Sequence, residues 1–294
     1  MVKLPKAALT TVLLFLAAVP LIAQNNRSAV SVTGSDMATC TVPDPCRTFG
    51  VAISKTNSGG EVVALSSGGY GPFTIDRSAT VTAAPGVYAA IALNGLGTAI
   101  TVNSGAGGRV TIRGLSLYGF GFAQVGIDVT QSGEETHIEN CIIDRFGNGD
   151  GILAFLNITV SDTIIRGCRS GIWINAPIKA SIERVQIYDT TALYAILAAG
   201  GSNVTVRDSI SIRSDGNGFL ANASILTLEN CLSSRAASYG IAGVGLGGVA
   251  RISNCVVTDN TYGLVGTIET FGNNKVRGNG TDIYSASLIS VAQQ

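Results

Sequence analysis

Charge is scarce in this chain of 294 residues, of which only 13% are Asp, Glu, Lys or Arg. An average soluble domain carries about 25%. The 19 basic residues only balance the 19 acidic ones, so we expect no nucleic-acid partner, which would need a basic surface. The single histidine, His137, excludes zinc sites built from several histidines.

Long apolar runs are also missing, except at the N-terminus. Lys3 and Lys6 precede an apolar stretch over residues 7–22, and Leu21-Ile22-Ala23 is a tolerable cleavage site. We therefore predict a signal peptide over residues 1–23 and a secreted protein (extracellular, cell-surface or periplasmic) with no membrane insertion once the signal is removed. An uncleaved anchor is the alternative, but this stretch is shorter than the ~20 residues that span a bilayer.

An internal repeat of about 23 residues runs through most of the chain. Its first landmark, usually Gly before a bulky apolar residue, recurs every 20–25 residues, at Gly126, Gly151, Gly171, Ala195, Gly218, Gly240 and Gly263. Its second landmark, a turn residue, recurs every 22–26 residues, at Gly114, Asn140, Asp162, Arg184, Asp208, Asn230 and Asn254. Gly, Asn and Asp accept a left-handed backbone, so Arg184 is expected to be mildly strained.

Each repeat reads as short strands with one buried face, because apolar and polar residues alternate up to the turn residue, as in THIENCII. Strands joined by such tight bends build stacked coils rather than hairpins. The sequence thus predicts an all-β fold, a single right-handed parallel β-helix over residues 46–285, with about 22–24 residues per coil and roughly 9–10 coils. Residues 24–45 form an N-terminal segment with a Cys loop, and residues 286–294 a C-terminal tail. A leucine-rich horseshoe lacks its Leu spacing here, and an antiparallel sandwich lacks hairpin signals.

Stacked coils place equivalent side chains above one another in ladders. The expected inner ladders are Leu115, Cys141, Thr163, Val185, Ser209, Cys231, Cys255; Ile127, Ile152, Ile172, Ile196, Phe219, Ile241, Leu264; and Ile112, Ile138, Val160, Ile182, Val206, Leu228, Ile252.

The six cysteines divide into two groups. Cys40 and Cys46 flank a short loop with two prolines and are predicted to form a disulfide, which export permits. Cys231 and Cys255 are inward neighbours on adjacent coils, slightly too far apart for a relaxed disulfide, so buried free thiols are favoured. Cys141 belongs to the same ladder, and Cys168 lies in a turn without an evident partner.

Residues 45–75, PCRTFGVAISKTNSGGEVVALSSGGYGPFTI, resemble the N-terminal cap of the pectin-lyase-like β-helix superfamily. The resemblance covers residues 40–285 and implies a short amphipathic helix over 48–55 that covers the first coil. It implies the fold rather than one activity, because the superfamily includes lyases, hydrolases, epimerases, adhesins and inert stalks. Its lyases hold Ca²⁺ with acidic residues on an outward strand face, and its hydrolases use a close set of Asp.

Neither acidic arrangement has a counterpart in the outward ladders. One ladder is Asp128, Leu153, Trp173, Leu197, Leu220, Ala242, Val265, and the other is Ser116, Ile142, Ile164, Gln186, Ile210, Leu232, Val256. We therefore name no catalytic residue, no metal ligand and no cofactor. Such apolar faces are typical of contact surfaces. Three interpretations of these apolar faces remain. Residues 282–294 could fold over them, they could form the contact in a homo-oligomer, or they could stack glycans around Trp173.

Charged residues gather in the turns after the second outward ladder. The set comprises Arg145, Arg166, Arg169, Asp189, Arg213 and Arg235. One interpretation is exposed ion pairs between adjacent coils, namely Asp144 with Arg166, Asp189 with Arg213, and Arg235 with Asp259. The other is a binding site for an anionic glycan that includes Trp173. His137 is interpreted as a surface residue.

These observations favour a secreted, non-enzymatic β-helix repeat protein that serves binding, adhesion or a surface scaffold. Its expected partner is a polysaccharide or a cell-surface glycan. The alternative is a carbohydrate-active enzyme, a polysaccharide lyase, hydrolase or epimerase, with an unusual site in the Arg-rich turns.

Overall fold

The computed structural model describes residues 24–291. The predicted signal peptide and the last three residues lie outside this range. Within it, no helix is both long and apolar enough to cross a bilayer.

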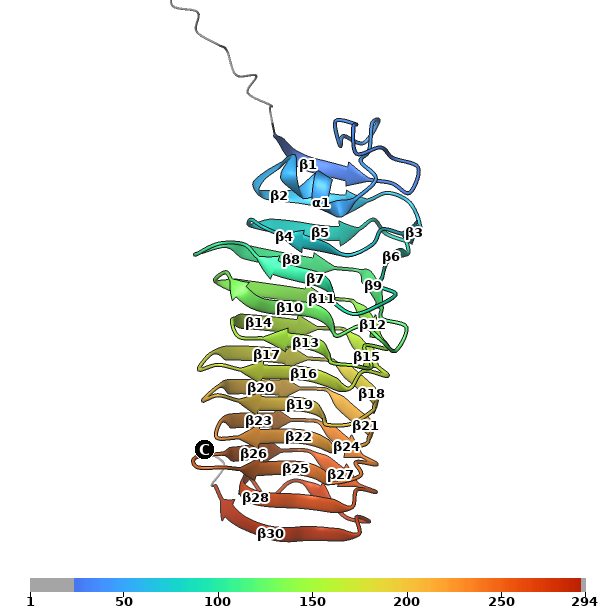
Figure 1. The fold of residues 1–294 in the computed structure, drawn as a ribbon. Coiled ribbons are helices and arrows are strands. Elements are labelled where there is room, and N and C mark those ends of the chain that lie inside the picture. The colour runs from blue at the N-terminus through green and yellow to red at the C-terminus, as the bar shows by residue number, and fades with distance from the viewer. Residues whose placement is uncertain (1–23, 292–294) are drawn as a thin grey trace, which may run out of the picture.

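The described chain winds into coils whose strands stack in three parallel sheets, which we call sheets I, II and III (Figure 1). Sheet I contains β1 (Asn25–Val30), β2 (Thr56–Ala64), β5 (Ala79–Ala83), β8 (Arg109–Arg113), β11 (Glu135–Glu139), β14 (Asn157–Ser161), β17 (Lys179–Glu183), β20 (Asn203–Arg207), β23 (Ile225–Glu229) and β26 (Val249–Ser253). Sheet II contains β3 (Gly68–Gly69), β6 (Ala89–Ala92), β9 (Leu115–Tyr118), β12 (Ile142–Asp144), β15 (Ile164–Arg166), β18 (Gln186–Thr190), β21 (Ile210–Ser214), β24 (Leu232–Ser234), β27 (Val256–Thr258) and β29 (Lys275–Val276).

Sheet III closes each coil. It contains β4 (Phe73–Ile75), β7 (Thr98–Asn103), β10 (Val125–Ser132), β13 (Asp150–Ala154), β16 (Ser170–Asn175), β19 (Tyr194–Ala199), β22 (Asn217–Asn222) and β25 (Tyr239–Val244). The last two strands, β28 (Tyr262–Thr270) and β30 (Thr281–Ser290), run across both sheet III and sheet I. Among residues 24–291 sheet II has ten strands, one in each coil, so the predicted parallel β-helix is confirmed.

Strand register confirms the predicted inner ladders. Ile127 pairs with Ile152 and the row continues through Phe219 to Leu264, while the row from Ile112 runs to Ile252. Every member of the three ladders is buried. The β-helix therefore has one continuous core along its axis.

The turns between sheets I and II contain the predicted left-handed residues. All seven have positive φ, including Arg184 at 52°. A non-glycine residue pays about 1–2 kcal/mol for this conformation. Arg184 adopts it beside Asp162, the turn residue of the preceding coil, with which it forms a 2.7 Å ion pair.

The turns between sheets II and III hold a second row of left-handed residues that the repeat did not predict. Its members are Arg145, Gly167, Asp189, Arg213, Arg235 and Asp259, with φ between 54° and 62°. Next to it lies a further inner ladder of Phe146, Cys168, Thr190, Ser214, Ala236, Asn260 and Asn279. Cys168 is thus a core residue rather than an isolated turn residue.

The four cysteines of the inner ladders, Cys141, Cys168, Cys231 and Cys255, are buried free thiols. Burial raises the pKa of Cys141 to about 11 and that of Cys168 to about 12. The Cys255 thiol and burial together raise the pKa of Cys231. Hydrogen bonding to the Cys231 thiol lowers the pKa of Cys255. All four thiols pack as small apolar groups in the core, and the raised pKa values of Cys141, Cys168 and Cys231 disfavour their thiolate forms at neutral pH.

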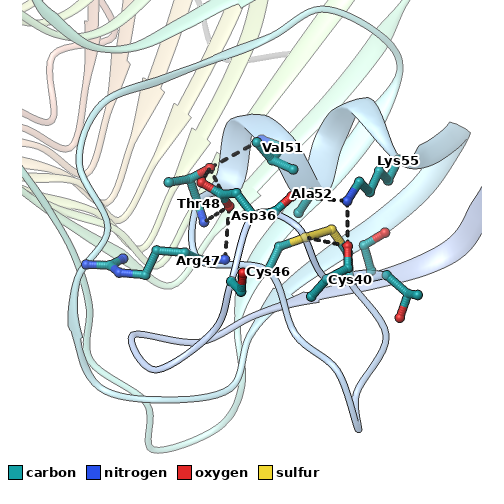
Figure 2. Close-up of a disulfide and its surroundings, with 12 residues drawn as sticks. Asp36, Cys40, Cys46, Arg47, Thr48, Val51, Ala52 and Lys55 are labelled. Carbon is teal, nitrogen blue, oxygen red and sulfur yellow. Dashed lines mark hydrogen bonds between the residues drawn. A yellow bond between two sulfur atoms is a disulfide. The ribbon is translucent and has the colours of Figure 1, made fainter.

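The N-terminal end is closed by a helix and a disulfide loop (Figure 2). Helix α1 (Phe49–Ser54) lies within the predicted range 48–55, begins after the N-cap Thr48, and packs against β1, β2 and β4. The predicted Cys40–Cys46 disulfide is present. The boundary at residue 46 is earlier in the structure, because β1 already pairs with β2 as the first strand of the β-helix.

The C-terminal boundary also differs from the prediction. Residues 282–290 do not fold back over the outward ladders; they belong to β30, which pairs along its length with β28. The alternation of apolar residues in TDIYSASLIS fits one more strand better than it fits a covering tail. In Figure 1 this strand forms the last layer, at the end opposite to α1.

Candidate functional site

The outward face of sheet I carries a row of polar side chains. From β5 to β26, one residue of each sheet I strand points outward between two buried neighbours, and these residues pair in register from coil to coil. The row consists of Thr80, Thr111, His137, Thr159, Ser181, Thr205, Thr227 and Arg251. We call it the hydroxyl ladder. Neighbouring strands lie about 4.8 Å apart, so the ladder presents hydroxyl groups at a regular interval along the axis.

An open groove of about 470 Å³ lies over the middle of this ladder. We call it the polar groove, and it crosses β14, β17 and β20 with one wall from β11. Its lining is Glu134, Glu135, Asn157, Ile158, Thr159, Lys179, Ala180, Ser181, Asn203 and Thr205. A second hollow of about 410 Å³, which includes Thr227, Arg251 and Phe271, lies farther along the same face.

The hydroxyl groups in the groove are available to a ligand. Thr159, Ser181 and Thr205 are at least partly exposed, and their hydroxyls form no hydrogen bond to another described residue. Beside them the Asn157 side-chain oxygen accepts a hydrogen bond of 3.0 Å from the Lys179 backbone N–H, which orients the Asn157 amide. The groove therefore offers both donors and acceptors in a fixed arrangement.

The charged groups at the groove differ in how they are engaged. Glu134 accepts two hydrogen bonds from Arg109, at 2.9 and 3.2 Å, and these hold the pKa of Glu134 below its usual value. Glu135 lies 3.6 Å from the His137 ring nitrogen Nε2. Lys179 forms no ion pair within the described part of the chain, so its ammonium group is free to meet a ligand.

The site residues predicted from the sequence do not line this groove. Arg145, Arg166, Asp189, Arg213 and Arg235 lie at the turns between sheets II and III, and Trp173 lies on the outward face of sheet III. The sequence did not predict the polar groove, because the charged turns and the apolar outward ladders are its more conspicuous patterns. A detectable signal was present, namely a hydroxyl residue at the centre of β14, β17, β20 and β23.

The charged turns contain two of the three predicted ion pairs. Arg166 lies 3.1 Å from Asp144, and Arg213 lies 2.5 Å from Asp189. Arg235 and Asp259 form no ion pair in residues 24–291, so that prediction is wrong. Both side chains of the Arg213–Asp189 pair are exposed, and such a pair contributes about 0–1 kcal/mol. The Asp144 side chain is only 13% exposed.

Arg145 lies 3.9 Å from Asp144 and also contacts an aromatic ring. Its guanidinium lies 5.5 Å from the centre of the Tyr118 ring and donates a 2.6 Å hydrogen bond to the Tyr118 hydroxyl. It is therefore partly committed to a side chain of its own protein.

Two of the predicted residues, Trp173 and Arg169, do come together with residues that the sequence did not indicate. The Trp173 ring meets Tyr194 edge to face, with centroids 6.4 Å apart. Asp150 lies beside this pair and is only 7% exposed. Burial raises the pKa of Asp150, while the Ser170 hydroxyl and the charge of Arg169 partly offset that rise. We call these residues the Asp150 cluster.

Comparisons with known proteins agree with this architecture. A family model described as a right-handed β-helix region matches residues 98–281, more than half of the chain. The chain belongs to this right-handed β-helix family. The right-handed parallel β-helix expected from the sequence is thereby confirmed. A search of curated proteins finds no match.

Two solved structures resemble this right-handed β-helix. The pectate lyase Pel9A has a TM-score of 0.54 and 14% identity, and the match covers 86% of this chain and 79% of the lyase. A complex of XylC with xylose has a TM-score of 0.54 and 9% identity, with 83% and 69% covered. At such identities the likeness shows a shared fold, so the function must be argued from this chain's own residues.

Proposed function

We propose that this right-handed β-helix is a non-enzymatic protein that binds an extended carbohydrate chain in its polar groove. The observation that carries the proposal is the set of unpaired hydroxyls on Thr159, Ser181 and Thr205, one in each of three successive coils. Sugars present hydroxyl groups as donors and acceptors, which this ladder and the flanking amides can meet in turn. A groove that runs along the axis suits a polymer better than a compact ligand.

The groove's charges support binding rather than catalysis. A general acid must hold a proton near neutral pH. Glu134 has the opposite tendency, because Arg109 stabilises its charged form. Lys179 would instead supply one hydrogen-bond donor with a positive charge, which attracts a carbohydrate that carries acidic groups.

We also propose that the protein acts outside the cytoplasm. The Cys40–Cys46 disulfide supports this location, because disulfides persist in oxidising compartments.

The binding proposal is tested by titrating soluble polysaccharides against the purified protein, after a glycan array has selected the strongest ligand. The triple variant Thr159→Val, Ser181→Ala, Thr205→Val removes three hydroxyls. It should weaken binding about 10- to 100-fold, since each net hydrogen bond contributes roughly 0.5–1.5 kcal/mol. The matched control, Thr80→Val with Thr111→Val, changes the same ladder outside the groove and should bind normally. No polysaccharide binding, or equal binding by the triple variant, would overturn the proposal.

A carbohydrate-active enzyme is the second candidate, and the Asp150 cluster favours it. A carboxylic acid whose pKa is raised by burial can act as a general acid, and Tyr194 and Arg169 lie beside it. Polysaccharide cleavage is followed through new reducing ends and unsaturated products. Turnover that disappears in Asp150→Asn would replace the binding proposal by this one.

A further inference from the structure

The C-terminal end of the β-helix presents an open strand edge. In residues 24–291, β30 pairs with β28 and with no other strand, so half of its backbone N–H and C=O groups have no ladder partner. Several of its apolar side chains are also exposed, namely Ile283, Tyr284, Leu288 and Ile289, followed by Val291. An unpaired edge with exposed apolar side chains is a template for pairing with another strand.

The other end of the molecule is closed. The outer edge of β1 is hydrogen-bonded by the disulfide loop: Ala29 N–H donates to Cys40 O at 2.7 Å, and Cys46 N–H donates to Ala29 O at 3.0 Å. A contact between the C-terminal end of one copy and the N-terminal end of the next is therefore blocked. The remaining arrangement joins two C-terminal ends. In it each copy contributes the same surface, so the contact is two-fold symmetric and the assembly stops at a dimer.

The charge on β30 permits this self-contact. Asp282 is its single charged residue, and its carboxylate accepts hydrogen bonds from the Asn279 side chain and backbone, at 2.9 and 3.0 Å. In an antiparallel pairing of two β30 strands, Asp282 lies near opposite ends. The two carboxylates are then roughly 25 Å apart, well beyond the Debye length of about 8 Å at physiological salt. No like charges face each other.

We infer that two copies of this chain join end to end through β30, paired antiparallel about a two-fold axis. The second copy supplies the missing hydrogen-bond partners and covers the exposed apolar side chains at the same time. The interface uses the end of the β-helix and not the outward ladders, of whose apolar members only Ile142 is exposed. The polar groove of each copy stays open in this dimer, because it lies on β11, β14, β17 and β20.

Sedimentation equilibrium on the purified protein tests the inference. The wild type should show twice the chain mass at micromolar concentration, with a monomer on dilution. The variant Ile283→Asp with Ile289→Asp places two further negative charges from each copy at the joint, one of them opposite Asp282 of the other copy, and should be monomeric. Its far-UV circular dichroism should equal that of the wild type. The control Ile142→Asp makes the same kind of change on an exposed side face and should leave the dimer intact.

Hydrogen exchange of the wild type adds a readout that needs no mutation. The amides of β30 should be protected at high concentration and lose that protection on dilution. A wild type that stays monomeric at every concentration would overturn the inference. So would a dimer that dissociates in Ile142→Asp but persists in the double variant. Neither result bears on glycan binding, so this inference and the proposed function fail independently.

Discussion

The two ends of this β-helix solve the same physical problem in different ways. Inside a parallel β-helix every strand has a neighbour on both sides, but the first and last coils each leave an edge and a core face open. At the N-terminus, residues 31–55 do not follow the repeat, and they cover both the open strand edge and the open core face. At the C-terminus the repeat simply runs on into β30, whose side chains are mostly exposed. Capping therefore depends on non-periodic sequence, and only one end of the described chain has it.

The N-terminal cap joins three elements through one carboxylate (Figure 2). Asp36 accepts hydrogen bonds from the backbone N–H groups of Arg47 and Thr48, at 3.0 and 2.9 Å, and also from the Thr48 hydroxyl. Thr48 in turn caps α1. The loop, the disulfide and the helix thus form one unit on the first coil, for which the C-terminal end has no equivalent among the described residues.

Removal of the helix's largest core side chain should give the largest difference between the ends. Phe49 is 1% exposed and lies against Tyr70 and Phe73, with ring centroids 5.1 and 4.8 Å away. Phe49→Ala should lower the free energy of unfolding by about 3–5 kcal/mol. Denaturant titration measures it, and hydrogen exchange should locate the loss in β1 and β2.

The matched change at the open end is Leu288→Ala, at a side chain that is 43% exposed. Both variants are made in the Ile283→Asp, Ile289→Asp background, which keeps the open end free. Leu288→Ala should change the free energy of unfolding by about 0.5 kcal/mol or less. Similar losses in the two variants would contradict the view that only the N-terminal end is capped.

Loss of the disulfide should have the next largest effect. Cys40→Ser with Cys46→Ser opens a short loop and should cost about 2–3 kcal/mol in the chain-entropy description. Reduction of the wild type should produce the same loss in the same denaturant titration. If the reduced wild type unfolds at the wild-type midpoint, the loop is held by its hydrogen bonds alone.

Much of the middle of the molecule could be predicted from the sequence, because periodicity determines it. The spacing of Gly and apolar residues was enough to assign the register from Ile127 to Leu264, and positive φ at Asn140 and its equivalents followed from residue type. Both boundaries were misplaced, because β1 lies before the repeat becomes regular and β30 continues it with weak alternation.

The candidate site was harder to predict than the fold. The side chains of four successive coils together form the walls and the floor of the groove, so no single strand sequence indicates it. Thr159, Ser181 and Thr205 are ordinary strand residues one at a time, and their common face appears only when the coils are stacked. Asp150 could not be recognised for another reason: it stands among Gly and Asn residues in the sequence NGDG, yet its side chain is buried in the structure.

The smallest expected difference between the two ends is in how their hydrogen bonds respond to acid. Asp44 accepts hydrogen bonds from the Thr39 backbone and hydroxyl, both 2.8 Å, and these hold its pKa below 3.8. Hydrogen bonds from Asn279, first from its side chain and then from its backbone, likewise lower the pKa of Asp282. A lowered carboxyl pKa contributes stability above the unfolded value, and this contribution is lost as the pH falls through the folded value.

Protonation weakens the hydrogen bonds that both carboxyls accept, but the surrounding chain should respond differently. At the N-terminal end the disulfide still holds the loop after Asp44 is protonated, whereas no covalent link holds the turn before β30. Hydrogen-exchange protection, corrected for the intrinsic pH dependence, should therefore fall more at Asn279 than at Thr39 below pH 3.8. Asp282→Ala, which removes the acceptor, should lose this protection already at neutral pH, and Asp44→Ala should change it little at Thr39. Equal losses at the two ends would show that the disulfide does not distinguish them.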